Sequence, residues 1–155
     1  MTGTTIKAPL AVCAAVIEKE GKVLLTQRPH GKQQGGFWEF PGGKIDPGES
    51  PHQSLKRELS EELAIEIEID SLLETVYYHY DWGSVLIIAY LCRWTAGELA
   101  HIEVADHAWA TPEQFSGYHI LPADQPILDR LRSRYSEKST KMNRKREKEM
   151  SQSTS

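Results

Sequence analysis

The sequence has few cysteines, no excess of positive charge and no membrane-length apolar run. Its two cysteines, Cys13 and Cys92, lie in apolar strand-like runs, so we expect two reduced core thiols rather than a disulfide framework. The formal net charge of −4 argues against bulk nucleic-acid binding, which depends on lysines and arginines that neutralise phosphates. The apolar run 10–17 lacks a cationic leader and a spanning length. These absences predict a cytoplasmic location, no membrane partner and no stable nucleic-acid complex.

The 155 residues are 39% hydrophobic, which is enough for one domain with a real core. We expect that domain over residues 9–135, after a flexible leader over 1–8. Residues 136–155 contain mainly Ser, Thr, Lys, Arg and Glu, and this composition predicts a flexible charged tail. Its basic run 141–148 could contact a phosphate polymer, but a solvated or fraying helical extension is the preferred interpretation.

Apolar alternation and turn residues outline the remaining elements. The expected strands are 10–17, 22–27, 37–40, 65–69, 72–80, 84–93 and 108–110, and the last helix is 126–135. The polar loop 29–36 either contacts substrate or merely connects two strands. Aromatic residues of the 72–93 hairpin could stack a base, although aromatic residues in strands more often pack in the core or pair across strands. These residues are Tyr77, Tyr78, Tyr80 and Trp82.

The helix that begins at Ser50 has the clearest start signal in the chain. Ser50 is a good N-cap, Pro51 suits the first helical position, and Gln53 stands where a capping box needs Glu or Gln. The helix then continues without internal Gly or Pro, with one apolar stripe formed by leucines spaced four residues apart, Leu55, Leu59 and Leu63. This stripe predicts that the helix packs on the core.

Three carboxylates, Glu58, Glu61 and Glu62, lie along the edge of that stripe. Like charges at this spacing destabilise a helix by about 0.2–0.5 kcal/mol, and by more when they are partly buried. A hard divalent cation such as Mg²⁺ would offset the repulsion, because it binds carboxylate oxygens and shares its other positions with water and substrate phosphates. An ordinary solvated helix face is the alternative for this helix taken alone.

The preceding glycine turn makes the pattern more specific. Gly43, then Glu49, Arg57-Glu58 and Glu61-Glu62 follow one another at spacings that resemble the Nudix box. The final glycine of that box is Ala64 here, which leaves the end of the helix open to question but not the carboxylates.

The resemblance extends from about residue 10 to 132 and is closest to the MutT-type branch of the Nudix hydrolases. The segments 38–44 (WEFPGGK) and 121–126 (LPADQP) resemble its box entrance and the segment that closes over the base. Asp124 stands where members that act on 8-oxo-dGTP have Asn and where members that act on CTP have Asp. Ionised Asp can only accept hydrogen bonds, so Asp124 leaves both bases open. The resemblance implies an α/β fold, an α/β/α sandwich with a mixed central sheet.

The same resemblance implies a role for each matching residue. The metal ligands or their supporting groups would be Gly42, Gly43, Glu49, Glu58, Glu61, Glu62 and Glu103. The catalytic group would comprise Glu58, Arg57 and Glu103, and either glutamate could be the base. The substrate would contact Arg28, Glu39, Phe40, Lys44 and Asp124.

These roles describe a Mg²⁺-dependent nucleoside triphosphate pyrophosphohydrolase, with Mn²⁺ as a substitute ion. The products would be a nucleoside monophosphate and diphosphate, and the substrates would be oxidised or modified nucleotides such as 8-oxo-dGTP or 5-substituted dCTP. This activity would sanitise the nucleotide pool for DNA replication and repair. The alternatives are hydrolysis of a nucleotide sugar, a dinucleotide or an RNA 5′ end, and a non-catalytic regulatory domain. Monomer and homodimer are both compatible with the sequence.

Overall fold

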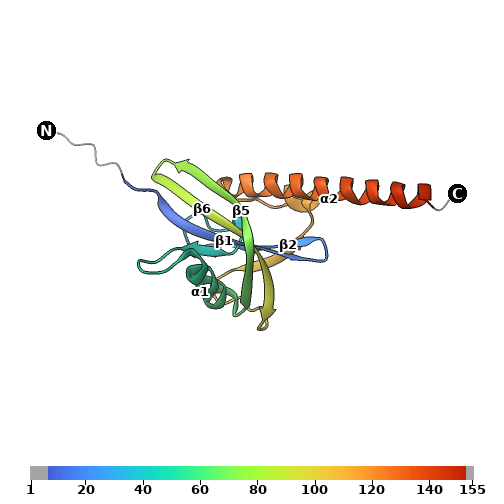
Figure 1. The fold of residues 1–155 in the computed structure, drawn as a ribbon. Coiled ribbons are helices and arrows are strands. Elements are labelled where there is room, and N and C mark those ends of the chain that lie inside the picture. Colours follow the sequence, from blue (N-terminus) through green and yellow to red (C-terminus); the bar gives the residue numbers. More distant parts are fainter. Residues whose placement is uncertain (1–6, 153–155) are drawn as a thin grey trace.

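The computed structural model describes residues 7–152, which form an α/β/α sandwich around a mixed sheet (Figure 1). The strands are β1 (Leu10–Lys19), β2 (Lys22–Gln27), β3 (Trp38–Glu39), β4 (Gly42–Lys44), β5 (Glu66–Tyr80), β6 (Gly83–Ala96) and β7 (Asp106–Ala110). The helices are α1 (Pro51–Leu63) and α2 (Gln125–Gln152), with short 3-10 helices η1 (Pro112–Gly117) and η2 (Pro122–Asp124). The predicted fold class is confirmed.

The central strand β1 has one edge that two different strands share. Its other edge pairs with β6, in parallel, from Leu10 to Ile17. On the shared edge, residues 12–14 pair with β4, whereas Glu18 and Lys19 pair with β2. Because β4 and β2 pair with different stretches of the same edge of β1, the sheet opens between these two strands. Residues of β1, β4 and β3 surround the cavity described below at this opening.

The alternation of side chains along β1 builds two cores, one on each face of the sheet. Cys13, Ala15 and Ile17 are buried together with the leucine stripe of α1. Ala14 and Val16 are buried on the opposite face with residues of α2. Figure 1 shows α1 and α2 on opposite sides of the sheet. The helix stripe that the sequence predicted therefore faces the core.

Helix α1 has the predicted start and an unusual end. The side chain of Ser50 accepts the backbone N–H of Gln53, and the side chain of Gln53 accepts the backbone N–H of Ser50, at 3.2 and 2.9 Å. At the other end, Ala64 adopts the left-handed conformation with φ 58° and ψ 30°, and its N–H donates to the Ser60 carbonyl at 3.0 Å. The helix thus ends as the Nudix box glycine would end it, although the residue is alanine.

Several element boundaries differ from the sequence prediction, including those of three strands, β4, β5 and β7. The separate strands 65–69 and 72–80 form the single strand β5, which stays paired with β6 through bulges between Ile69 and Glu74. Residues 42–44 are a strand and not only a turn, because their glycines allow close approach to β1. Strand β7 begins at Asp106, two residues before the predicted strand 108–110, because residues 106–110 pair with β2.

The prediction that the last helix ends at Tyr135 is wrong, because α2 continues to Gln152. Residues 136–152 contain no Gly or Pro and are rich in Lys, Glu and Arg, which are good helix formers. Every residue from Ser136 to Gln152 is exposed, so this half of the helix projects from the sandwich (Figure 1). Most of the predicted leader, residues 1–6, and the last three tail residues lie outside the described part. Within that part, no helix is long and apolar enough to cross a membrane.

Candidate active site

A cavity of about 820 Å³ opens at the split in the sheet. Of the residues that the sequence predicted for the site, its walls contain Arg28, Glu39, Phe40, Gly42, Gly43, Lys44, Glu58, Glu62, Glu103 and Asp124. The remaining three, Glu49, Arg57 and Glu61, are not among its lining residues and contact one another beside it. The fold therefore brings segments far apart in the chain to one cavity, with an acidic wall and a second polar group near Asp124.

The two glycines of β4 are required by close contacts rather than by a turn. A Cβ on Gly42 would overlap the carbonyl oxygen of Cys13, and φ is +156° there. A Cβ on Gly43 would lie 2.6 Å from the carboxyl carbon of Glu58. Glycine at these positions lets β4 pair closely with the edge of β1 and lets the Glu58 side chain reach the backbone of β4.

The register of β4 assigns different directions to the two glycine carbonyls. Ala15 N–H donates to Pro41 O at 2.8 Å, and Ile45 N–H donates to Ala11 O at 3.0 Å. Since hydrogen-bonded pairs recur every second residue in an antiparallel ladder, Cys13 and Gly43 form the pair between these two bonds. The Gly43 carbonyl is therefore used by the sheet, whereas the Gly42 carbonyl points away from β1.

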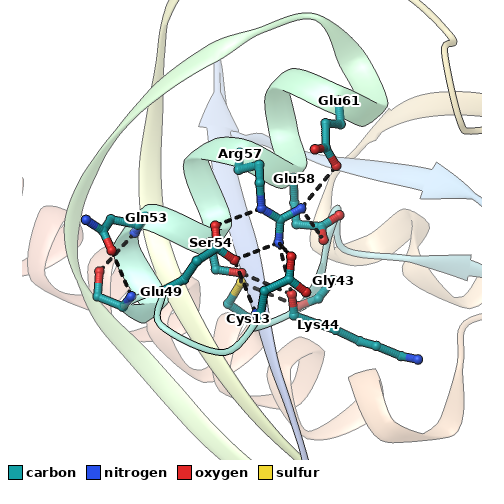
Figure 2. Close-up of polar contacts among 11 residues, drawn as sticks. Cys13, Gly43, Lys44, Glu49, Gln53, Ser54, Arg57, Glu58 and Glu61 are labelled. Atoms are coloured by element: carbon teal, nitrogen blue, oxygen red, sulfur yellow. Dashed lines mark hydrogen bonds and ion pairs between the residues drawn. The ribbon is translucent and has the colours of Figure 1, made fainter.

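Arg57 organises the carboxylates of the box (Figure 2). Its Nε and Nη2 donate to the two oxygens of Glu49 at 2.8 and 2.9 Å. Its Nη1 donates to both Glu58 and Glu61 at 3.1 Å. Nη2 also lies 3.3 Å from the Lys44 carbonyl oxygen and 3.2 Å from Asp46. The guanidinium thus joins α1 to the loop before it, and its hydrogen bonds hold the pKa of Glu49 below the usual value.

Glu58 and Glu62 form the buried part of the acidic wall. Burial raises the pKa of Glu58, while the charge of Arg57 opposes that rise. Burial, followed by the charges of Glu58 and Glu39, raises the pKa of Glu62 to about 9. Without a cation, this wall therefore cannot carry its full negative charge at neutral pH.

Arg28, Glu39 and Asp124 form the second polar group of the cavity. Arg28 Nη1 lies 3.1 Å from a Glu39 carboxylate oxygen. Asp124 accepts the backbone N–H of Phe40 at 2.9 Å and is only 6% exposed. Burial raises the pKa of Glu39, and burial together with the charge of Glu39 raises the pKa of Asp124 to about 8. Asp124 is thus predominantly protonated at neutral pH and can both donate and accept hydrogen bonds.

Glu103 and Lys44 extend the cavity toward solvent. Both side chains line it and both residues are exposed. The backbone N–H of Glu103 donates to the Glu62 carbonyl oxygen at 3.3 Å, which attaches the segment after β6 to the end of α1. Glu103 therefore reaches the cavity on a segment that is fixed to the end of the acidic helix.

The aromatic residues of the hairpin separate into different roles. Tyr80 and Trp82 line the cavity, and their rings stack with centroids 5.4 Å apart. The Tyr80 hydroxyl accepts the Ala123 N–H at 3.2 Å, which ties the hairpin to η2. Tyr78 packs against the core, and Tyr77 is 66% exposed. The sequence offered all four as candidates for stacking a base, and the fold places Tyr80 and Trp82 in the cavity wall.

Two polar residues around Arg57 were missed by the sequence reasoning. Ser54 is buried in α1 and donates its hydroxyl to the Lys44 carbonyl at 3.1 Å. Asp46 adds a fourth carboxylate around Arg57. Neither carried a recognisable signal, because a serine inside a helix and an aspartate in a loop are common on protein surfaces.

Comparison with known proteins identifies the family of the chain. The NUDIX domain model matches residues 7–134. CTP pyrophosphohydrolase of Escherichia coli K12 is 41% identical over 124 residues, which cover 77% of this chain and 89% of that protein. The 8-oxo-dGTP diphosphatase of Haemophilus influenzae is 34% identical over 126 residues, covering 81% and 93% of the two chains.

Solved structures give the same result. The solution structure of the E. coli ORF135 protein is 36% identical with a TM-score of 0.69, and the match covers 86% of this chain and 94% of that one. A MutT NUDIX hydrolase from Burkholderia pseudomallei is 26% identical with a TM-score of 0.73, covering 80% and 98%. From the match over residues 7–134 and the near full-length relatives, we conclude that this chain belongs to the NUDIX domain family.

Proposed function

We propose that the chain is a Mg²⁺-dependent pyrophosphohydrolase that converts a nucleoside triphosphate and water to the monophosphate and diphosphate, and that it removes oxidised or modified nucleotides. The observation that carries this proposal is the cavity of about 820 Å³, which joins the acidic wall of α1 to the Arg28, Glu39 and Asp124 group. The names of the E. coli and H. influenzae relatives support a nucleotide substrate.

The acidic wall fits a hard divalent cation. Burial raises the pKa of both Glu58 and Glu62, and the charge of Glu58 raises that of Glu62 further, so a cation would favour the ionised carboxylates and relieve their repulsion. All the donors are oxygens, as Mg²⁺ prefers. The carbonyl of Gly42 is the better backbone ligand because the register engages that of Gly43 with β1. We therefore assign the ion to Gly42, Glu58 and Glu62, with Glu61 and Glu103 as further ligands.

The remaining residues of the box would position these ligands. Arg57 orients Glu58 and Glu61 through hydrogen bonds, and Glu49 holds Arg57 in turn. When bound, Mg²⁺ would neutralise the phosphate oxygens and align a water with the leaving group. Glu58 and Glu103 are our two candidates for the carboxylate that accepts the proton of this water. Lys44, at the mouth of the cavity, would contact the outer phosphates.

The other end of the cavity would bind the base. Arg28, Glu39, Phe40 and Asp124 form its polar and apolar contacts, and the stacked pair of Tyr80 and Trp82 adds an aromatic wall. A protonated Asp124 presents one donor and one acceptor, which suits a base edge with one donor next to one acceptor. Cytosine has its amine beside the acceptor N3, and 8-oxoguanine has ring N–H groups beside its carbonyls.

A diphosphate-release screen with Mg²⁺ tests the activity. Purified protein should release diphosphate from at least one nucleoside triphosphate, and the panel should include the normal deoxynucleotides, 8-oxo-dGTP, 5-methyl-dCTP and CTP. The ranking of kcat/KM values identifies the preferred base and sugar. Absence of release from every nucleotide would rule the proposal out, and activity confined to nucleotide sugars, dinucleotides or RNA ends would assign another phosphoanhydride.

The metal assignment has its own test. Glu62→Gln removes one negative charge at nearly constant size, so it should raise the Mg²⁺ concentration needed for half-maximal rate by about 10-fold or more. Lys56→Gln is a suitable control because Lys56 lies on the same helix but pairs with exposed Glu68. A Glu62→Gln protein with wild-type kcat at limiting Mg²⁺ would remove Glu62 from the metal site.

A further inference from the structure

A second group of potential metal ligands lies outside the cavity, in and beside the segment between β6 and β7. His101 Nε2 is 2.7 Å from His107 Nδ1, and an Asp106 carboxylate oxygen is 4.0 Å from His101 Nε2. Within residues 7–152, this is the one set of three or more His, Cys, Asp or Glu side chains whose ligand atoms all lie within 4.8 Å of one another. Neither histidine nor Asp106 lines the cavity.

The backbone fixes both ends of this segment. Ala100 N–H donates to the Leu63 carbonyl at 2.9 Å, beside His101. At the other end, Asp106 and His107 pair with Gln27 and Thr26 of β2. The two histidines are therefore attached to different parts of the fold, yet their ring nitrogens meet. Such an arrangement limits the freedom that ligand side chains would lose when they bind an ion.

The two rings come from different parts of the fold and meet at one point, since His101 Nε2 and His107 Nδ1 are 2.7 Å apart. Imidazole nitrogens are common metal ligands, so both rings can offer a nitrogen to one ion. Asp106 is oriented as well, because its oxygen that lies 4.0 Å from His101 Nε2 accepts the backbone N–H of His107 at 2.8 Å.

The donor types select a different ion from that of the acidic wall. Two imidazole nitrogens and one carboxylate favour Zn²⁺ and related transition ions, whereas Mg²⁺ prefers oxygen ligands alone. Zinc–nitrogen bonds of about 2.0–2.1 Å in a tetrahedral site place two nitrogens roughly 3.3 Å apart, so the rings must separate by about 0.6 Å. Both His101 and Asp106 are exposed, which leaves room for water as a fourth ligand.

We propose that His101, Asp106 and His107 bind a divalent transition ion of the Zn²⁺ class, at a site separate from the carboxylates of α1. An ion there would join the two ends of the segment that carries Glu103. The N–H groups of Ile102 and Glu103 already donate to the Glu62 carbonyl, so the same segment touches the acidic helix. Any effect on hydrolysis through Glu103 rests on the proposed function, but binding of the ion does not.

Titration of the full chain with Zn²⁺ and Co²⁺ tests the site. The protein is kept in excess Mg²⁺ so that oxygen-only sites are occupied, and binding is followed by calorimetry and by the visible absorption of Co²⁺. We expect one equivalent to bind, with cobalt bands of nitrogen and oxygen ligation. Thiolate bands are not expected because Cys13 and Cys92 are buried. The double variant His101→Gln/His107→Gln should bind at least about 10-fold more weakly.

Three comparisons decide the outcome. His79→Gln is the matched control, because His79 is an exposed histidine on the hairpin whose Nδ1 lies 3.0 Å from the Ser84 hydroxyl. It should keep wild-type affinity for Zn²⁺. Glu58→Gln/Glu62→Gln should keep the site while losing diphosphate release, which separates this proposal from the proposed function. The single variant His101→Gln serves if the double variant does not fold, since His101 is exposed.

Three results would overturn the proposal. One is Zn²⁺ affinity that is unchanged by loss of His101 and His107, and another is binding that disappears with the α1 carboxylates instead. Failure of the wild-type chain to bind Zn²⁺ or Co²⁺ in excess Mg²⁺ would likewise mean that the three side chains form only a hydrogen-bonded surface group.

Discussion

At the scale of single residues, the cavity gathers acidic groups whose burial opposes ionisation. Glu39, Glu62 and Asp124 all have raised pKa values, with burial as the first cause in each case. The stability of the fold alone does not explain why three poorly solvated carboxyl groups lie in one cavity. A ligand that carries charge or forms hydrogen bonds would explain it, because the ligand would interact with groups that the folded chain leaves poorly solvated.

The raised pKa of Asp124 makes its contribution to the free energy of unfolding depend on pH. In the unfolded chain its carboxyl has a pKa of about 3.9, whereas burial and Glu39 raise it to about 8 in the fold. Between these values the folded protein binds more protons, so the contribution of Asp124 is complete at low pH and is lost as pH rises toward 8. Asp124→Asn should therefore lose stability less steeply than wild type from pH 5 to 8, by up to about 1.4 kcal/mol for each pH unit.

Denaturant unfolding of the two proteins at several pH values measures this difference. Asn can still accept the Phe40 N–H, so the packing of η2 should be preserved. Asp129→Asn is the control, because Asp129 is an exposed aspartate of α2 that pairs with Arg132. Parallel curves for wild type and Asp124→Asn would show that Asp124 is ionised in the fold.

Gly43 offers a steric test of the acidic wall. A Cβ at this position would lie 2.6 Å from the Glu58 carboxyl carbon, so Gly43→Ala should displace Glu58. A shift of about 1 Å in a catalytic group can lower the rate about 100-fold, and we expect kcat/KM for the best nucleotide to fall by that order. Among the described residues, a Cβ added at Gly117 would meet no atom within 4 Å other than those of the adjacent chain, so Gly117→Ala should keep kcat/KM near the wild-type value. Equal activity of the two variants would mean that Glu58 does not act where we assign it.

At the scale of secondary-structure elements, helix α1 was predictable because its signals are local. Its cap, leucine stripe and carboxylate spacing all lie within one segment, and the structure begins and ends the helix at the expected residues. The strand identity of 42–44 and the continuity of β5 were not predictable, since both depend on partners far along the chain. The same holds for the site, where Tyr80 and Asp46 gain their positions only from the folded backbone.

Ala64 is the one position of the box that departs from the family, and it has a measurable cost. The left-handed conformation disfavours an L-residue with a Cβ by roughly 1–2 kcal/mol, whereas glycine adopts it freely. Ala64→Gly should therefore raise the free energy of unfolding by about 1 kcal/mol, or Tm by about 2–4 °C. Ser60→Gly, in the exposed interior of the same helix, should lower it by about 0.5–1 kcal/mol. Destabilisation by Ala64→Gly would contradict the assigned cap conformation.

At the scale of the whole molecule, different interactions stabilise the sandwich and the projecting half of α2. The sandwich has a core on each face of the sheet. Leu131 is the last residue of α2 that is fully buried in these cores. The helical state beyond Ser136 is supported by helix propensity and exposed charges. Composition predicted that this segment lacks a core and offered a helical extension, but it could not separate that extension from a flexible tail, because an exposed helix and a flexible tail share the same polar sequence.

A truncated chain that ends at Ser136 separates these two parts. Residues 137–152 are all exposed, so their removal should change the free energy of unfolding by no more than about 0.5 kcal/mol. The ion pair between Arg134 and Glu18 remains in this shorter chain. Leu131→Ala in the full chain should instead lower the free energy of unfolding by about 2–5 kcal/mol, because Leu131 is fully buried.

The truncated protein should match the full chain in its rate of diphosphate release, in Tm and in the assembly state measured by sedimentation. A loss of stability or a change in assembly would instead assign the projecting helix to a contact between copies, and the domain boundary would move beyond residue 135.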